Sequence, residues 1–279
     1  MIKLGIIGYP LGHSISAVIQ NAAFESLGLN ASYDVLETPP ENLIDRIKML
    51  KRDDFNGFNV TIPLKIPVSL FVNDIDDDAN IAGCVNTVKI DSNKNLFGYN
   101  TDIFGFMKAI PKNVVLESKS AAILGTGGAS RAAAVGLIRK GIKEIDFYTR
   151  NIINSQQAIN YLRAKFPQIK FEAYQIQNAR EFSKYSIIVN ATPIGMRGFA
   201  MDESPLEFEA LKTLPHDAVV YDIVYNPMDT VLLQYAKKLN LQTVEGLDML
   251  IFQAEKAINI WTGKTPDTQT MKIAALRAL

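Results

Sequence analysis

Short, mostly apolar runs alternate with longer mixed segments along the first part of the chain. Such runs predict strands buried in a sheet, and the mixed segments between them predict helices. Ser14 or Ser16 can cap the first helix, and Pro39 and Pro40 can open the second, since proline is tolerated in a first turn. The predicted strands are 3–7, 32–37, 57–61 and 85–90, and the predicted helices are about 15–27 and 39–50. This alternation predicts an α/β fold with a mostly parallel sheet.

A second strand–helix unit begins near residue 103 and opens with a glycine-rich turn. A helix follows the turn to about residue 140, where Gly141 closes it. The tail from Gly246 has a helical pattern and is too short to form a third domain, so it should pack on one of the other two. The predicted strands here are 120–124, 144–148, 186–190 and 218–224. We expect an α/β substrate domain at 1–102 plus 246–279 and a Rossmann-like dinucleotide-binding domain at 103–245.

Composition narrows the class of protein without changing this picture. A chain of 279 residues suits two domains, and 48% hydrophobic with 21% charged residues is typical of a soluble globular protein. The 29 basic residues balance 29 acidic ones, so no basic field points to a nucleic-acid partner. No apolar run reaches the roughly 20 residues that span a bilayer. The absence of a signal-peptide pattern and the single Cys84, which excludes an intrachain disulfide, favour a cytoplasmic protein.

The glycine-rich turn at 125–129 carries the first chemical signal. Gly125, Gly127 and Gly128 lie between a predicted strand and a predicted helix. Glycine lets the backbone approach a pyrophosphate closely, and the helix N-terminus then offers N–H groups to the phosphates. Ser130 stands where the usual spacing has its last glycine, so a purely structural turn is the alternative. The position of the turn in the strand–helix order favours dinucleotide binding.

The end of the next strand discriminates between NAD and NADP. An acidic residue at this position binds the ribose 2′-hydroxyl, whereas an arginine accommodates a 2′-phosphate. Arg150 follows this strand directly, while Asp146 lies inside it and Glu172 comes much later. The alternative for Arg150 is an ordinary surface arginine. The pattern predicts NADP as the cofactor.

Polar residues gather at the ends of predicted strands in the first domain. Ser14 and Ser16 lie at a loop-to-helix junction, where their hydroxyls can bind a carboxylate. The alternative is that they only cap the helix. Further amides, hydroxyls, a lysine and a carboxylate occur within 59–65, 83–87 and 98–102. These groups suit a small ligand that has several hydroxyls and one acid.

Together these segments resemble the shikimate dehydrogenase family, and the resemblance runs nearly from end to end. The matching motifs are 8–10 with 13–16, 59–65, 85–87, 100–102, 125–129, 190–196, 222–227, and 246–250 followed by Gln253 and 261–263. The resemblance implies reversible, NADPH-dependent reduction of 3-dehydroshikimate to shikimate in aromatic amino-acid biosynthesis. It also implies an active site in the cleft between the two domains.

The resemblance further implies a role for each matching residue. Lys65 and Asp102 would be the catalytic pair, and Ser14 and Ser16 would bind the substrate carboxylate. The other substrate-binding residues would be Asn59, Thr61, Asn86, Tyr225 and Gln253. The cofactor-binding residues would be Asp77, Gly125, Thr126, Gly127, Gly128, Ala129, Thr149, Arg150, Asn151, Ile223 and Gly246.

The chain departs from the usual family pattern at Ala17, Gln20, Thr149 and Glu255, and none of these changes removes a catalytic group. One alternative is an NAD-using quinate/shikimate dehydrogenase, against which Arg150 argues. Another is a non-catalytic shikimate-binding regulatory module, against which the retention of Lys65 and Asp102 argues. No His, Cys and carboxylate cluster has metal-ligand spacing, so no metal is expected. The expected partner is a small-molecule substrate, bound by a monomer or homodimer.

Overall fold

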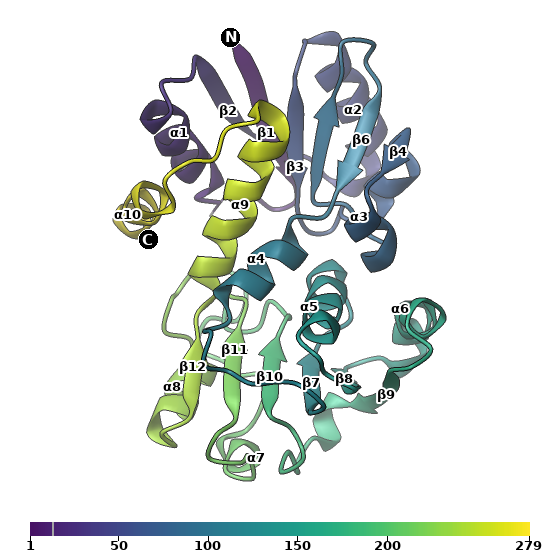
Figure 1. The fold of residues 1–279 in the computed structure, drawn as a ribbon, viewed down its shortest axis with the longest axis vertical. Coiled ribbons are helices and arrows are strands. Elements are labelled where there is room, and N and C mark those ends of the chain that lie inside the picture. The colour runs from purple at the N-terminus through teal and green to yellow at the C-terminus, as the bar shows by residue number, and fades with distance from the viewer. Residues whose placement is uncertain (13) are drawn as a thin grey trace. The chain divides into compact units, whose positions relative to one another are not determined.

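The computed structural model describes residues 1–12 and 14–279 (Figure 1). The chain divides into two compact units, 1–105 with 251–279, and 106–250. These units differ from the expected domains, 1–102 with 246–279 and 103–245, by a few residues at each boundary. Within the described ranges, no helix has the length and apolar character needed to cross a membrane.

The first unit contains a sheet with the strand order β2-β1-β3-β5-β6-β4. The strands are β1 Ile2–Gly8, β2 Ala31–Glu37, β3 Gly57–Val60, β4 Asp74–Ile75, β5 Thr87–Ile90 and β6 Leu96–Tyr99. Strand β1 pairs in parallel with β2 and β3, and β4 pairs in parallel with β6. The prediction of a mostly parallel sheet is confirmed, but β5 runs antiparallel to β3 and β6. The short 91–95 connection explains the β5–β6 pairing, because a parallel crossover needs a dozen or more residues.

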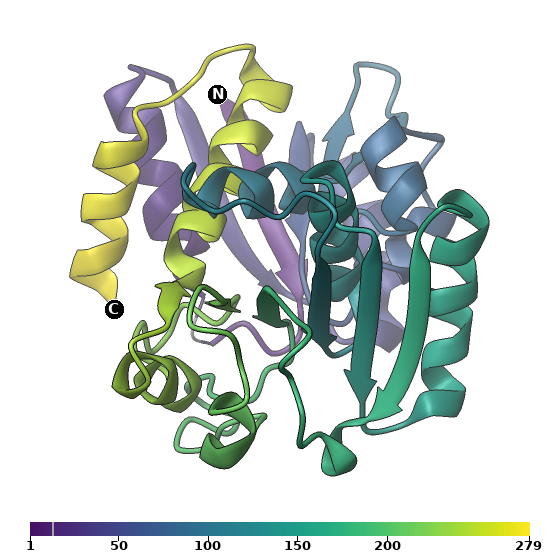
Figure 2. The same cartoon turned by 60° about the horizontal axis from the view of Figure 1, so that its bottom comes forward.

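Helices surround this sheet. They are α1 Ser16–Ser26, η1 Pro40–Asn42, α2 Leu43–Arg52, η2 Pro67–Leu70, α3 Asp77–Ala82, the start of α4 Asp102–Ala109, the end of α9 Gly246–Thr262, and α10 Thr268–Ala278. Helices α1 and α10 lie side by side (Figures 1 and 2). The helical tail was predicted, and it breaks where Gly263 has a φ of 72° and Asp267 caps α10.

The second unit contains a sheet with the strand order β12-β11-β10-β7-β8-β9, and each neighbouring pair is parallel. Its strands are β7 Ser120–Leu124, β8 Glu144–Thr149, β9 Lys170–Gln175, β10 Ile187–Asn190, β11 Val219–Asp222 and β12 Gln242–Val244. Its helices are α5 Gly128–Arg139, α6 Ile152–Lys165, η3 Ile176–Asn178, α7 Phe208–Leu211 and α8 Val231–Lys238, with α6 beside β9 (Figure 2).

This strand order is that of a Rossmann fold, in which the third, second and first strands are followed by the fourth, fifth and sixth. The predicted Rossmann-like domain is therefore confirmed. The order reverses between β7 and β10. Ligands of such sheets bind at the carboxyl ends of the strands beside this switch point. The glycine-rich turn follows β7 at that edge.

Candidate active site

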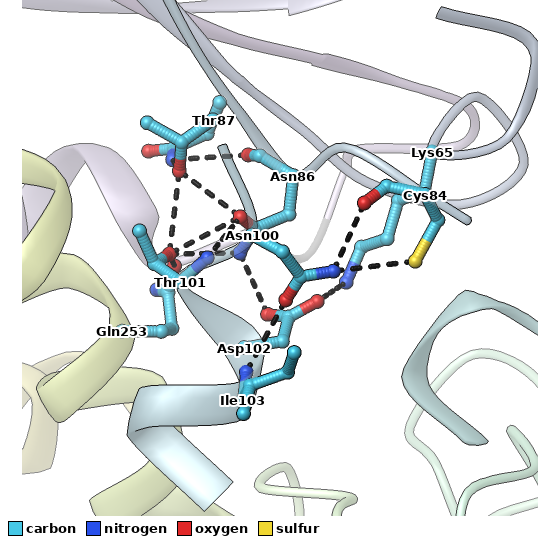
Figure 3. A network of polar contacts seen from close by, with 10 residues as sticks. Lys65, Cys84, Asn86, Thr87, Asn100, Thr101, Asp102, Ile103 and Gln253 are labelled. Carbon is cyan, nitrogen blue, oxygen red and sulfur yellow. Dashed lines mark hydrogen bonds and ion pairs between the residues drawn. The ribbon is translucent and has the colours of Figure 1, made fainter. Parts of the chain in front are cut away.

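Lys65 and Asp102 form a largely buried ion pair in the first unit (Figure 3). Lys65 follows β3 after one tight turn, and Asp102 is the first residue of α4. Lys65 Nζ lies 2.5 Å from Asp102 Oδ2, and the two side chains are 15% and 6% exposed. The structure thus brings together the two residues expected to form the catalytic pair, although 37 positions separate them in the chain.

Two neighbours fix the orientation of the Asp102 carboxylate. Asn86 Nδ2 donates to Asp102 Oδ1 at 2.8 Å and to Thr101 Oγ1 at 2.9 Å. The Thr101 backbone N–H donates to Asn86 Oδ1 at 2.7 Å, which fixes the amide in turn. Both carboxylate oxygens therefore accept bonds from groups within the protein, one from Asn86 and one from Lys65.

Gln253 on α9 joins the same network. Thr101 Oγ1 donates to Gln253 Oε1 at 3.4 Å (Figure 3). This bond connects the helical tail to the loop before α4, although 152 positions separate the two residues. The predicted substrate residues Asn86 and Gln253 and the catalytic pair thus belong to one polar cluster.

Asn59, which we predicted to bind substrate, makes hydrogen bonds within the protein from both ends of its amide. Its Oδ1 accepts from Tyr33 at 2.5 Å and from Gln20 at 3.4 Å. Its Nδ2 donates to the Asn86 carbonyl at 3.2 Å and to Thr87 Oγ1 at 2.9 Å. These bonds use both donors and both lone pairs of the amide. Asn59 therefore holds neighbouring residues of the cluster in place, and its role in binding substrate stays a prediction.

The hydroxyl residues Ser14, Ser16 and Thr61 follow two neighbouring parallel strands, β1 and β3, at the same edge of the sheet. All three are partly buried. Ile15 occupies the N-cap of α1, so the prediction that Ser14 or Ser16 occupies this position is wrong. Instead, Ser14 Oγ accepts from the Ser16 backbone N–H at 3.3 Å. The motif residue His13 lies outside the described residues.

The turn after β7 has room for a phosphate group. Gly125 has a φ of 100°, and a Cβ there would lie 3.1 Å from Thr192 Cγ2 and 3.3 Å from the Ala191 carbonyl oxygen. Around Gly127 the space is open, since a Cβ there would meet no described atom within 4 Å. Helix α5 starts at Gly128, and Thr126 and Ala129 complete the predicted segment.

Beneath this turn, Ser130 Oγ is fully buried and has no hydrogen-bond partner among the residues described. Amides in the first turn of a helix lack intrahelical acceptors, and the positive end of the helix dipole favours an anion there. The open glycine turn, the helix N-terminus and this buried hydroxyl fit the pyrophosphate of a dinucleotide.

At the end of β8, Thr149 is buried and Arg150 is exposed. The Asn151 backbone N–H donates to Thr149 Oγ1 at 3.3 Å, so these residues form a tight turn that presents Arg150 to solvent. Asp146 is fully buried inside the strand, 2.5 Å from Lys184 Nζ and 2.7 Å from the Tyr185 hydroxyl. The Asp146 carboxylate therefore interacts with protein groups inside the unit and is not placed to bind a ribose hydroxyl.

Another buried carboxyl, after Asp102 and Asp146, lies where β10 and β11 end. Asp222 accepts from Asn190 Nδ2 at 2.9 Å, from Thr230 Oγ1 at 2.7 Å and from the Val224 backbone N–H at 3.0 Å. Its burial raises its pKa to about 7. Sequence reasoning included Asn190 and Asp222 in motifs but missed that they form one cluster. Each ends a strand, which was the available signal.

The Asp222 cluster adjoins the predicted nicotinamide residues Ile223 and Gly246. A Cβ on Gly246 would lie 2.2 Å from the Ile223 carbonyl oxygen, so only glycine allows this close approach. Tyr225 in the same unit is partly buried, and burial raises the pKa of its phenol. Asp77 is exposed at the start of α3 in the first unit. The roles of Tyr225 and Asp77 remain predictions from the resemblance.

Over the ranges 1–12 and 14–279, no group of three His, Cys, Asp or Glu side chains is arranged to hold a metal ion. The chemistry available to the cluster is that of an ammonium, a carboxylate, amides and hydroxyls. An ammonium held by a carboxylate can stabilise negative charge on a substrate oxygen and exchange a proton with it.

Comparisons with known proteins agree with this geometry. Residues 6–88 match the family described as "Shikimate dehydrogenase substrate binding domain", and 246–276 match "Shikimate 5'-dehydrogenase C-terminal domain". The chain is 39% identical over 279 residues to the shikimate dehydrogenase (NADP(+)) of Methanocaldococcus jannaschii, covering 98% of this chain and 95% of that protein.

Solved structures give the same picture. The shikimate 5-dehydrogenase of Thermus thermophilus, solved with NADP(H) and shikimate, is 35% identical with a TM-score of 0.84, and each chain covers 100% of the other. The quinate dehydrogenase of Corynebacterium glutamicum, solved with NAD, is 27% identical with a TM-score of 0.88, and 99% of each chain is covered. With relatives this similar over nearly its whole length, the chain belongs to the shikimate dehydrogenase family.

Proposed function

We propose that this chain catalyses the reversible, NADPH-dependent reduction of 3-dehydroshikimate to shikimate, a step of aromatic amino-acid biosynthesis. The observation that carries the proposal is the buried Lys65–Asp102 pair, set in a cluster of amides and hydroxyls. The relative from Methanocaldococcus jannaschii bears the name of this enzyme, and the Thermus thermophilus structure was solved with both ligands.

In this reaction Lys65 and Asp102 act on the carbonyl oxygen that becomes a hydroxyl. NADPH, when bound, supplies the hydride. Negative charge grows on the oxygen during reduction, and the Lys65 ammonium stabilises this charge and donates the proton. Asp102 accepts a hydrogen bond from the new hydroxyl and holds Lys65 in place, because its carboxylate lies 2.5 Å from Nζ.

The remaining residues bind and orient the two ligands. Ser14 and Ser16 bind the substrate carboxylate, and Thr61, Asn86 and Gln253 bind its ring hydroxyls, with Tyr225 near the acid end. The turn from Gly125 to Ala129 holds the cofactor pyrophosphate. The adenosine end of the cofactor, with its 2′-phosphate, is bound by Thr149, Arg150 and Asn151. Ile223 and Gly246 line the nicotinamide, and Asp77 contacts the cofactor.

The burial of Asp146 weighs against NAD as the preferred cofactor. NAD enzymes of this fold place a carboxylate at the ribose 2′-hydroxyl, and Asp146 is already paired with Lys184 and Tyr185. The Lys65–Asp102 pair weighs against a regulatory module without catalysis. We further propose a cytoplasmic location and a monomer or homodimer as the active form.

An absorbance assay at the NADPH band tests the proposal. Shikimate with NADP should give rapid NADPH formation, and shikimate with NAD or quinate with NAD should react much more slowly. Equal or faster turnover of quinate with NAD would identify a quinate dehydrogenase instead. No turnover of either substrate, with shikimate still bound in calorimetry, would identify a binding module.

A further inference from the structure

A chain of hydrogen bonds runs into the active site from Tyr33, a residue that the proposed reaction does not use. Tyr33 lies on β2 and is 4% exposed. Its hydroxyl donates to Asn59 Oδ1 at 2.5 Å. Burial raises the pKa of the Tyr33 phenol, so it keeps its proton and stays a donor. The amide oxygen only accepts, so the direction of this first bond is fixed.

The chain continues from Asn59 to Asp102 through two further side chains. Asn59 Nδ2 donates to Thr87 Oγ1 at 2.9 Å, and Thr87 Oγ1 donates to Asn86 Oδ1 at 3.1 Å. Asn86 Nδ2 then donates to Asp102 Oδ1 at 2.8 Å (Figure 3). A carboxylate only accepts, so each donor in the chain points toward Asp102. Bonds aligned in this way strengthen one another in a buried site.

Register explains how Tyr33 reaches the site from the far side of β1. Tyr33 pairs with Leu4 of β1, and Asn59 of β3 pairs with Ile6. Residues two apart on a strand share a face, so both side chains lie on the same face of the sheet. The phenol spans β1 to meet the amide. The Tyr33 ring lies 6.4 Å from the Trp261 ring, which packs beside it.

We propose that Tyr33 is a positioning residue: its hydroxyl, acting through Asn59, Thr87 and Asn86, orients the Asp102 carboxylate toward Lys65. The proposal rests on the proposed function of the Lys65–Asp102 pair. Gln20 is the other donor to Asn59, but its bond is long at 3.4 Å. Rotating the Asn59 amide by half a turn would place Oδ1 against the Asn86 carbonyl, which also only accepts. The Asn86 carbonyl therefore disfavours this rotation and keeps Oδ1 facing the Tyr33 hydroxyl, which donates to it.

Tyr33→Phe tests the proposal because it removes the hydroxyl and keeps the ring. We expect kcat/KM for shikimate to fall by about tenfold, the usual effect of one lost buried hydrogen bond, while KM for NADP stays within twofold. Tyr221→Phe is the matched control, because Tyr221 is fully buried and its hydroxyl has no partner in the part of the chain that the structure describes. The control should match the parent in all these parameters.

A double-mutant cycle separates positioning from general loss of structure. Asn86→Ala breaks the chain between Tyr33 and Asp102, so adding Tyr33→Phe to it should change kcat/KM for shikimate no further. Additive losses would overturn the proposal, because Tyr33 would then act by another route. Trp261, the single tryptophan of the chain, reports on packing beside Tyr33. Its emission should be the same in the parent and in Tyr33→Phe.

The remaining outcomes distinguish the two proposals. If the parent does not oxidise shikimate, the proposed function fails and the role of Tyr33 falls with it. If the parent is active and Tyr33→Phe matches it, only the role of Tyr33 is overturned. A shifted Trp261 emission with equal rises in KM for shikimate and NADP would show a purely structural role and would also overturn it.

Discussion

Lys65 Nζ lies 2.5 Å from Asp102 Oδ2, and neither side chain is more than 15% exposed. Removing one partner of such a pair leaves the other charge buried and unpaired, which costs about 3–5 kcal/mol. Asn86 still donates to the remaining carboxylate and offsets part of this cost. The pair therefore contributes to the stability of the first unit as well as to its chemistry, and experiments on Lys65 must separate the two effects.

Lys65→Met should lower kcat by about 10²–10⁴, the usual contribution of a positioned acid–base group. KM for shikimate should change much less, because the serines and Gln253 remain. Steady-state kinetics on protein shown to be folded by circular dichroism measures both. Lys94→Met is the control: Lys94 pairs with Asp54 on the surface, where ion pairs contribute about 1 kcal/mol or less. A kcat for Lys65→Met within a few-fold of the parent would exclude Lys65 as the catalytic group.

Replacing Ser14 and Ser16 together by alanine should raise KM for shikimate more than it lowers kcat. Each hydrogen bond to a charged group contributes roughly 1.5–3 kcal/mol, so the combined effect on KM should exceed tenfold. Ser26→Ala, at the far end of α1, is the matched control, because the Ser26 hydroxyl donates to the nearby Ala23 carbonyl. An unchanged KM in the double variant would show that the two serines form a structural turn before α1 and do not bind the substrate carboxylate.

The sequence predicted the alternation of strands and helices and a Rossmann-like domain, and its resemblance to a known family implied the pair of Lys65 and Asp102. It predicted neither β6 nor the antiparallel direction of β5, because β6 is only four residues long and periodicity does not give the direction of a strand. Asn59 shows a second limit. A polar residue at a strand end suggests ligand binding, but its partners Gln20 and Tyr33 lie 39 and 26 positions away and only folding brings them to it.

The burial of Asp222 could not be predicted from the sequence either. Nothing in the neighbouring residues indicates that its carboxyl is fully buried and accepts from three donors. Its pKa is about 7 in the folded chain, against an ordinary value of 3.8. Between these two pH values the folded state keeps a proton that the unfolded state releases. The free energy of unfolding therefore falls as pH rises through this window, by up to about 1.4 kcal/mol per pH unit.

Asp222→Asn should remove this dependence, because an amide does not titrate and can still bond to Asn190 and Thr230. The free energy of unfolding of the variant relative to the parent should rise by about 2.5 kcal/mol between pH 5 and pH 8. Urea denaturation at both pH values measures it. Asp267→Asn is the control: its hydrogen bonds with Thr270 lower the pKa of Asp267, so it stays ionised over this range. A stability difference for Asp222→Asn that is independent of pH would contradict the assigned pKa.

Arg150 lies exposed at the end of β8, where the 2′-phosphate of NADP would arrive in a Rossmann fold. A guanidinium binds a phosphate through two parallel hydrogen bonds, and NAD lacks this group. The parent should therefore prefer NADP in kcat/KM. Arg150→Ala should weaken the use of NADP, by about 1.5–3 kcal/mol if Thr149 and Asn151 share little of the phosphate, and should leave the use of NAD nearly unchanged.

Arg150→Asp should shift the preference further, because its carboxylate repels the phosphate and can accept a bond from the free ribose 2′-hydroxyl of NAD. Arg180→Ala is the control, since Arg180 is a surface arginine of the same unit and pairs with Glu207. The measurement is kcat/KM for both cofactors in the parent and the three variants. A parent that used NAD as well as NADP, or an Arg150→Ala variant that lost both cofactors equally, would show that Arg150 does not bind the 2′-phosphate. Equal losses would instead place Arg150 near the adenosine or pyrophosphate that NAD and NADP share.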